Sequence, residues 1–294
     1  MPSTVHRSLS DRLRAEARRR GRPAAEVRRE FVFQRFLGRV FAEPNSRWVL
    51  KGGAGLLIRI QQARDSKDVD LVVPATAFDL TEAVDALRSA VAVDAGDQLT
   101  FVVDTVARST EEHSVALLRV NCFIGARPFE RFTIDVSSRS QLVAKVDRIR
   151  PRPVIDLIGA DPLPRFVLYP LPDQVADKLC AMYSRYGASR GPSTRYRDLV
   201  DLVLIITTSH LDASLTSRAI TVEAARRGCT LPARITSPGP EWKAGYAHSV
   251  RTVPLEAGLR NLDGALVVVG GCLDPVLATS ATGTWNPQAR RWQG

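Results

Sequence analysis

The chain has 294 residues, 45% of them hydrophobic, which is enough for one large folded domain or two ordinary ones and excludes a disordered chain. The formal net charge is +10, and residues 1–50 carry twelve arginines against five carboxylates. Such a charge either serves general solubility or favours an anionic partner, such as nucleic acid, a nucleotide or a membrane surface. Its concentration in one segment favours a basic N-terminal arm that contacts such a partner.

The sequence contains no apolar run of about 18 residues, the length that a membrane-spanning helix requires. Its first residues lack the apolar stretch of a secretory signal peptide, so we expect a cytoplasmic protein with no membrane partner. The four cysteines form no CxxC pair, which argues against a zinc site or a disulfide framework; they are Cys122, Cys180, Cys229 and Cys272.

Hydrophobic periodicity predicts that helices and strands alternate through the first half of the chain. Helices are expected at residues 8–20, 23–43, 53–60 and 77–92, and strands at residues 48–50, 68–73, 99–107, 115–123 and 129–136. Proline and acidic residues recur at 151–164, a composition typical of a connection between domains. We therefore place a domain boundary after residue 150.

The second half of the chain is predicted to be mostly helical after a short strand at residues 166–169. One helix begins at Pro172, another begins near Arg195, and the longest helical stretch is expected at residues 255–277. The predicted fold class is therefore α+β. A mixed-sheet domain at residues 1–150 carries the basic N-terminal helices, and a mostly helical domain follows at residues 151–294.

Two carboxylates, Asp68 and Asp70, lie at positions i and i+2 of one predicted strand. Their side chains leave the same face of the strand, about 6.5–7 Å apart along the backbone. The two negative charges repel each other unless a cation lies between them, and Mg²⁺ is the natural candidate because it prefers hard oxygen ligands and accepts substrate phosphates. The alternative interpretation is a solvated strand face.

A glycine pair, Gly52 and Gly53, stands at the predicted turn from the strand at residues 48–50 into the following helix. Glycines allow backbone N–H groups to approach a phosphate closely, and a helix N-terminus favours negative charge. The pair by itself could be an ordinary turn. Together with the Asp-x-Asp strand, however, it predicts an anion cradle beside a metal site.

The order strand, Gly-Gly, helix, Asp-x-Asp strand resembles the nucleotidyltransferase fold of the DNA polymerase β-like superfamily. In that fold the first two carboxylates hold the metal ions and a third carboxylate comes from a later strand. The candidate for the third is Asp135, inside Phe132-Thr-Ile-Asp-Val136. A single buried Asp on a strand could instead be satisfied by hydrogen bonds.

A wider resemblance rests on four motifs: Lys51-Gly-Gly, Arg64-Asp-Ser-Lys-Asp-Val-Asp-Leu71, Asp177-Lys-Leu179 and Arg195-Tyr-Arg-Asp-Leu-Val-Asp-Leu202. Together they resemble the AbiEii family of nucleotidyltransferase toxins, whose mycobacterial members are called MenT toxins, in a type IV-like toxin–antitoxin system. The family's lysine-bearing helix and its following acidic helix correspond here to Lys178 and to Asp198 with Asp201. A helical hairpin could bring Lys178 beside Asp198, and Arg197 can pair with Asp201 at i, i+4.

The resemblance implies transfer of a nucleoside monophosphate from an NTP to the 3′ acceptor end of tRNA, which blocks aminoacylation and translation. It implies two Mg²⁺ ions on Asp68, Asp70 and Asp135, and a catalytic set of those three residues with Lys178 and Asp198, so that the helical domain completes the active site. It also implies a partner antitoxin. The residues expected to bind the nucleotide are Lys51, Gly52, Gly53, Ser66, Lys67 and Lys178.

The acceptor is the least constrained part of this hypothesis. Basic residues would track the phosphates of tRNA, and the candidates for RNA binding are Arg18, Arg19, Arg20, Arg190 and Arg195. One alternative is a nucleotidyltransferase that modifies a protein hydroxyl or a small molecule. Another is an inactive nucleotidyltransferase fold that only binds RNA or a protein partner.

Overall fold

The computed structural model describes residues 4–44, 46–74, 80–109, 115–139, 142–186 and 191–294. The chain divides into two compact units. The first, here called the α/β unit, comprises Met1–Arg59, Asp65–Gln141 and Val146–Leu168; the second, the helical unit, comprises Ile60–Arg64, Leu142–Lys145 and Tyr169–Gly294.

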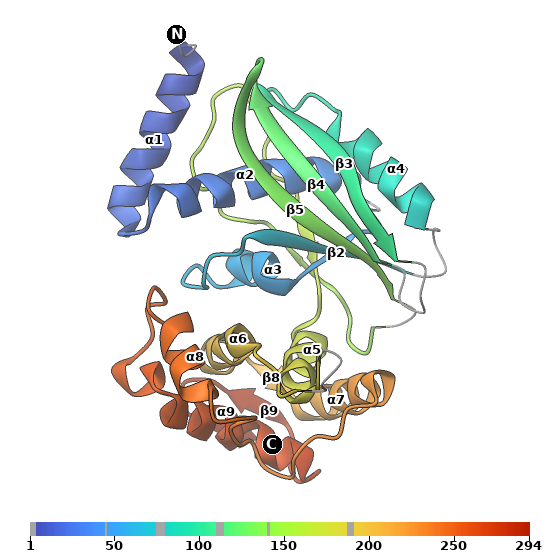
Figure 1. Ribbon diagram of the computed structural model, residues 1–294, viewed down its shortest axis with the longest axis vertical. Helices are drawn as coiled ribbons and strands as arrows, with labels where there is room; N and C mark the ends of the chain where they lie inside the picture. Colours follow the sequence, from blue (N-terminus) through green and yellow to red (C-terminus); the bar gives the residue numbers. More distant parts are fainter. Residues whose placement is uncertain (1–3, 45, 75–79, 110–114, 140–141, 187–190) are drawn as a thin grey trace. The chain divides into compact units, whose positions relative to one another are not determined.

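The described part of the α/β unit contains a seven-stranded mixed sheet (Figure 1). The strands lie in the order β3 (Leu99–Ser109), β4 (Val115–Ile124), β5 (Arg127–Arg139), β2 (Asp68–Pro74), β1 (Val49–Lys51), β7 (Phe166–Leu168) and β6 (Asp147–Ile149). The pairs β2–β5 and β1–β7 are parallel and the other neighbours are antiparallel.

Alternation along the strands gives this sheet one buried face and one open face. Val69 and Leu71 on β2 are buried, whereas Asp68 is exposed and Asp70 is partly exposed. Helices α2 (Ala24–Val40) and α4 (Leu80–Val91) pack on the buried face (Figure 1). Phe36 on α2 makes edge contacts with sheet side chains, at centroid distances of 5.4 Å to Phe101 and 5.4 Å to Phe132.

Two further helices complete the α/β unit. Helix α1 (Thr4–Arg20) packs on α2 through its buried residues Leu9, Leu13 and Ala17. Helix α3 (Gly52–Arg59) follows β1 directly and contacts β1 and β2.

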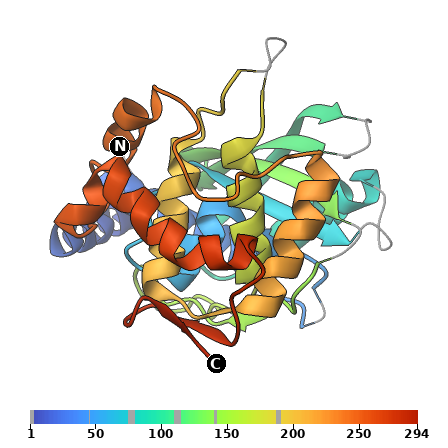
Figure 2. The same cartoon turned by 90° about the horizontal axis from the view of Figure 1, so that it is seen from below.

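The helical unit combines helices with a small antiparallel sheet. Its helices are α5 (Leu171–Tyr183), α6 (Tyr196–Thr208), α7 (Ala213–Arg227), α8 (Trp242–Ser249) and α9 (Leu262–Leu277), with a short 3₁₀ helix η1 (Ala257–Arg260). Its strands are β8 (Leu211–Asp212), β9 (Thr284–Asn286) and β10 (Arg291–Gln293). The β9–β10 hairpin is the dark red segment beside the C-terminus in Figure 2.

The β9–β10 hairpin lies in a region where the sequence predicted mostly helix. Hydrogen bonds from its two tryptophans attach it to the helices of the same unit. The indole of Trp285 is buried and donates to the carbonyl of Ile206, and the indole of Trp292 donates to the carbonyl of Cys272. The long helix expected at residues 255–277 begins only at Leu262, because the Asn261 side chain caps it by accepting from Gly264 N–H.

The boundary between the units also differs from the division after residue 150. The α/β unit extends to Leu168, because β7 pairs in parallel with β1 and so belongs to the large sheet. Strand β6, which pairs with β7, falls in a segment with no predicted element. Among the described residues, no helix has the length and apolar character needed to cross a membrane.

Candidate active site

The register of β2 and β5 brings the three predicted carboxylates onto one face of the sheet. Asp70 and Asp135 are direct partners across this parallel pair, and Asp68 lies two residues before Asp70, opposite Thr133. Because side chains alternate along a strand, Asp68, Asp70 and Asp135 all leave the open face. On the other side of β2, Lys51 of β1 is the antiparallel partner of Asp70.

The charges in this cluster influence one another. Burial raises the pKa of Asp135, the negative charge of Asp68 raises it further, and Lys51 opposes both effects. The Ser66 hydroxyl donates to Asp68 Oδ1 at 3.0 Å and so orients that carboxylate. Lys67 is exposed next to Asp68 in the chain. The cluster therefore carries excess negative charge partly balanced by lysine.

The glycine pair lies at the start of α3, beside the second carboxylate. Gly52 has φ +67°, and a Cβ built on it would lie 1.8 Å from Asp70 Oδ2. A side chain at position 52 therefore meets both backbone strain and a direct clash. Gly53 is buried in the first turn of α3, where backbone N–H groups have no partner within the helix. This turn can present N–H groups to an anion.

The carboxylate cluster fits a hard divalent cation by its chemistry. Three Asp side chains on one sheet face supply oxygen ligands, and the Asp68–Asp135 repulsion is what a cation relieves. Within the described ranges, no three His, Cys, Asp or Glu side chains already converge as a metal-binding group.

Lys178 forms a second cluster, inside the helical unit, with two carboxylates of the neighbouring helix. Its Nζ on α5 donates to Asp198 Oδ1 at 3.1 Å and to Asp201 Oδ2 at 2.5 Å on α6. Burial by itself lowers the pKa of Lys178, but the charges of Asp201 and Asp198 outweigh it, so the net shift is upward. The predicted helical pairing of Lys178 with Asp198 is thus present.

The same cluster contains partners that the sequence did not indicate. Arg64 donates to Asp201 through Nε at 2.9 Å and through Nη2 at 2.8 Å. The expected Arg197–Asp201 pair is wrong: Arg197 is exposed, and Lys178 and Arg64 take the carboxylate instead. The only sequence signal for Arg64 was its place at the start of the Asp-x-Asp motif.

The arginines predicted to bind RNA differ in their availability. Arg18 is exposed and has no ion-pair partner within the described part of the chain. Arg19 donates to Glu16 at 2.7 and 2.6 Å, and Arg20 donates to Glu16 at 2.5 Å and to Glu30 at 3.0 Å. Arg195 donates to Asp198 at 2.5 Å from a half-exposed side chain. Arg190 lies outside the described residues.

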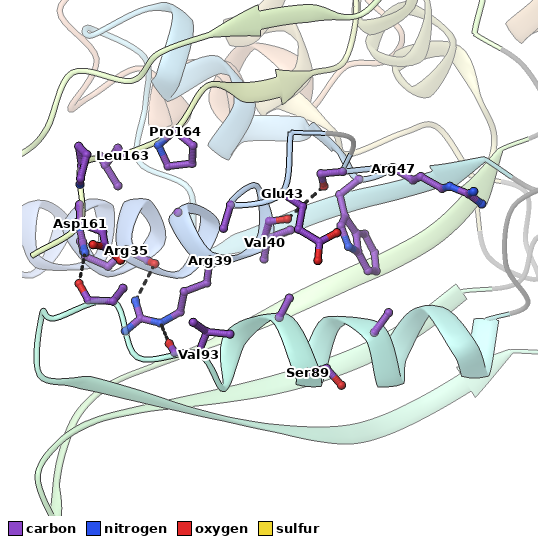
Figure 3. A pocket seen from close by; sticks show the side chains of 18 residues that line it. Arg35, Arg39, Val40, Glu43, Arg47, Ser89, Val93, Asp161, Leu163 and Pro164 are labelled. Atoms are coloured by element: carbon purple, nitrogen blue, oxygen red, sulfur yellow. Dashed lines mark hydrogen bonds between the residues drawn. The ribbon is translucent and has the colours of Figure 1, made fainter.

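A hollow of about 650 Å³ in the α/β unit lies away from the carboxylates, between α2, α4 and the segment at residues 161–164 (Figure 3). Two arginines in its wall are engaged: Arg39 and Arg35 both bind the fully buried carboxylate of Asp97. Burial raises the pKa of Asp97, but the bonds from Arg39 and Arg35 outweigh it and the net shift is downward. These arginines stabilise the fold and are not free to bind a ligand.

A mixed sheet with a glycine turn beside an Asp-x-Asp strand, and a third carboxylate in register on the next strand, defines a protein of the nucleotidyltransferase class. Residues 35–267 match the family model described as nucleotidyl transferase AbiEii toxin, type IV toxin–antitoxin system. The chain therefore belongs to the AbiEii family of nucleotidyltransferase toxins, as the sequence motifs predicted.

One solved structure supports the fold, and two others show a weaker similarity. MenT4, a nucleotidyltransferase toxin from Mycobacterium tuberculosis H37Rv, is similar with a TM-score of 0.53 and 20% identity, over 91% of this chain and 98% of that chain. A putative nucleotidyltransferase from H. pylori is similar with a TM-score of 0.47 and 15% identity, over 86% of this chain and 95% of its own. JHP933 from Helicobacter pylori gives a TM-score of 0.47 and 15% identity, over 84% and 89%. No curated protein matched the sequence.

Proposed function

We propose that this toxin transfers a nucleoside monophosphate from an NTP to the 3′ acceptor end of tRNA and releases pyrophosphate. The acceptor oxygen forms a new bond to the α-phosphorus while the bond from that phosphorus to the β-phosphate oxygen breaks. The observation that carries the proposal is the register of Asp70 with Asp135, which with Asp68 places three carboxylates on the open sheet face. Blocked 3′ ends cannot be aminoacylated, so translation stops.

Asp68, Asp70 and Asp135 would hold two Mg²⁺ ions. When bound, the ions neutralise the triphosphate and stabilise the entering and leaving oxygens. The chain's own residues would orient the metal-binding carboxylates and accept a proton. Ser66 fixes one oxygen of Asp68, and Asp135, in register with Asp70 on the same sheet face, would accept the proton of the attacking hydroxyl.

The residues that we assign to nucleotide binding supply either backbone N–H groups or positive charge. N–H groups at Gly52 and Gly53, at the start of α3, would bind triphosphate oxygens. Lys51, beside Asp70, and the exposed Lys67 would add positive charge. Lys178 stays protonated between its two carboxylates, and we assign it to the triphosphate, with Asp198 as the residue that holds it.

The assignment of tRNA as acceptor is supported by charge and by the family. The chain is a type IV toxin with a net charge of +10, and Arg18 is exposed, so that its guanidinium can meet a phosphate. Phosphate contacts of this kind dominate nucleic-acid affinity and weaken as salt rises. Membership of a type IV system also implies a cognate antitoxin that restrains the activity.

The test is incubation of the pure protein with total tRNA, Mg²⁺ and each α-labelled NTP in turn, beside Asp68→Ala and an EDTA-treated sample. We expect label at the 3′ end of tRNA with the unmodified protein in Mg²⁺, and none in the other two samples. Label that reaches protein and survives RNase would replace tRNA by a protein acceptor. Binding of NTP without any transfer would show an inactive fold.

A further inference from the structure

The Lys178 cluster contains more charge than one lysine–aspartate pair needs. Five side chains of the helical unit alternate in sign along a chain of bonds: Arg64, Asp201, Lys178, Asp198 and Arg195. The Asp201 carboxylate, the second member of this chain, is fully buried. Buried ion pairs pay a large desolvation cost, and apolar residues of similar volume often serve helix packing as well. Stability therefore does not by itself account for this arrangement.

The Arg64–Asp201 ion pair is bidentate and has a defined geometry. Nε of Arg64 donates to Oδ1 and Nη2 donates to Oδ2, so the planar guanidinium fixes the plane of the carboxylate. Lys178 then binds Oδ2, the same oxygen that Nη2 contacts. Asp201 thus has a defined orientation, and the direction of the Lys178 bond follows from it.

Lys178 retains one donor that these contacts do not use. An ammonium group has three N–H donors, and within the described part of the chain Lys178 has two acceptors, Asp198 and Asp201. Its side chain is 8% exposed, so the group is not wholly enclosed. With two N–H bonds fixed by carboxylates, the direction of the third is fixed too.

We propose that Asp201 and Arg64 are positioning residues, which hold the Lys178 ammonium so that its third N–H meets an anionic oxygen of the nucleotide triphosphate. This inference rests on the proposed function, because it takes Lys178 to contact the NTP. Asp198 holds Lys178 from the other side, and Arg64 acts on Lys178 through Asp201. Neither Asp201 nor Arg64 touches the substrate.

A double-mutant cycle tests whether Arg64 acts on Lys178 through Asp201. The variants are Asp201→Asn, Arg64→Met and the two combined, with Arg218→Met as control, because Arg218 is an exposed arginine of the same unit without an ion-pair partner in the described part of the chain. We expect kcat/KM for the NTP to fall roughly 10- to 100-fold in Asp201→Asn, in line with the loss of a charge-assisted bond. Arg64→Met should lower it in the otherwise unmodified protein and add little to Asp201→Asn. Additive losses would overturn the inference.

The variant Arg64→Lys separates position from charge and is the mildest change if Asp201→Asn fails to fold. It keeps the positive charge beside Asp201 but loses the bidentate hydrogen bond. We expect kcat/KM to remain below that of the unmodified protein. Full activity in Arg64→Lys would show that charge alone matters and would overturn the positioning role.

Competitive acetylation of lysines, read by peptide mass spectrometry, gives a readout that does not depend on transferase activity. The chain has only five lysines, so Lys51, Lys67, Lys145 and Lys243 serve as internal references. Asp201→Asn removes a charge that favours the ammonium form, so Lys178 should react faster than in the unmodified protein. An unchanged Lys178 rate would overturn the inference even if transfer is seen. A faster rate in a protein that uses no NTP would leave Asp201 holding Lys178 but would overturn the contact with the triphosphate.

Discussion

Gly52 and Asp70 approach so closely that the glycine has no room for a side chain: a Cβ at position 52 would lie 1.8 Å from Asp70 Oδ2. The two residues come from neighbouring elements, the first residue of α3 and strand β2. The glycine turn and the carboxylate strand therefore constrain each other directly.

We predict that Gly52→Ala abolishes most nucleotide transfer. The added methyl displaces the Asp70 carboxylate, and the left-handed backbone costs about 1–2 kcal/mol more. Gly125→Ala is the matched control, because Gly125 also has a positive φ, of 57°, but its Cβ would meet nothing within 4 Å. Both variants should lose a little thermal stability, and only Gly52→Ala should lose activity. Equal activities would contradict the steric argument.

The pKa of Asp135 should respond in opposite directions to two neighbouring substitutions. Asp68→Asn removes the repelling charge and should lower the pKa, whereas Lys51→Met removes an attracting charge and should raise it. NMR titration of ¹³C-labelled aspartate carboxyls, in a buffer without divalent cations, measures both shifts. Shifts of the same sign would show that the three side chains do not interact as described.

Asp97→Asn should destabilise the α/β unit by about 3–5 kcal/mol, because it leaves two buried guanidiniums, Arg35 and Arg39, without their carboxylate. Denaturant unfolding monitored by fluorescence measures the loss. Asp85→Asn, which removes an exposed carboxylate paired with Arg88, should cost far less. A loss for Asp97→Asn no larger than that of the control would argue against the network.

Arg18→Ala should weaken RNA binding more than Arg19→Ala does. Arg18 is exposed without an ion-pair partner in the described part of the chain, whereas Arg19 is held by Glu16. Loss of one phosphate contact should reduce the slope of log affinity against log salt by about one. Filter binding of labelled tRNA at several salt concentrations gives both values, and the reverse order would exclude Arg18 as a contact.

Glu16 makes the stability of the N-terminal helices depend on pH. Bonds from Arg19 and Arg20 outweigh burial and lower its pKa from 4.5 to about 2. A lowered folded-state pKa means that its contribution is complete above pH 4.5 and is lost as the pH falls toward 2. The melting temperature of Glu16→Gln should therefore lie below that of the unmodified protein at pH 7, and the difference should shrink between pH 4.5 and 2. A difference independent of pH would mean that the charge of Glu16 plays no part.

Much of the carboxylate cluster could be predicted from the sequence, because the relevant spacing is local. The two-residue period of a strand places Asp68 and Asp70 on one face, and a strand followed by Gly-Gly and a helix predicts the turn at Gly52. The family motifs were sufficient to identify the AbiEii fold, and the family model and the fold of MenT4 confirm it.

The partners of the charged groups were decided only by the tertiary structure. Arg64 and Asp201 are 137 residues apart, and the i, i+4 rule instead selected Arg197, which is exposed. Arg20 belongs to a basic segment by composition, yet the packing of α1 on α2 brings Glu30 within 3.0 Å of it. Local periodicity determines which face a side chain takes, whereas an ion pair depends on which distant residues the fold brings within about 4 Å.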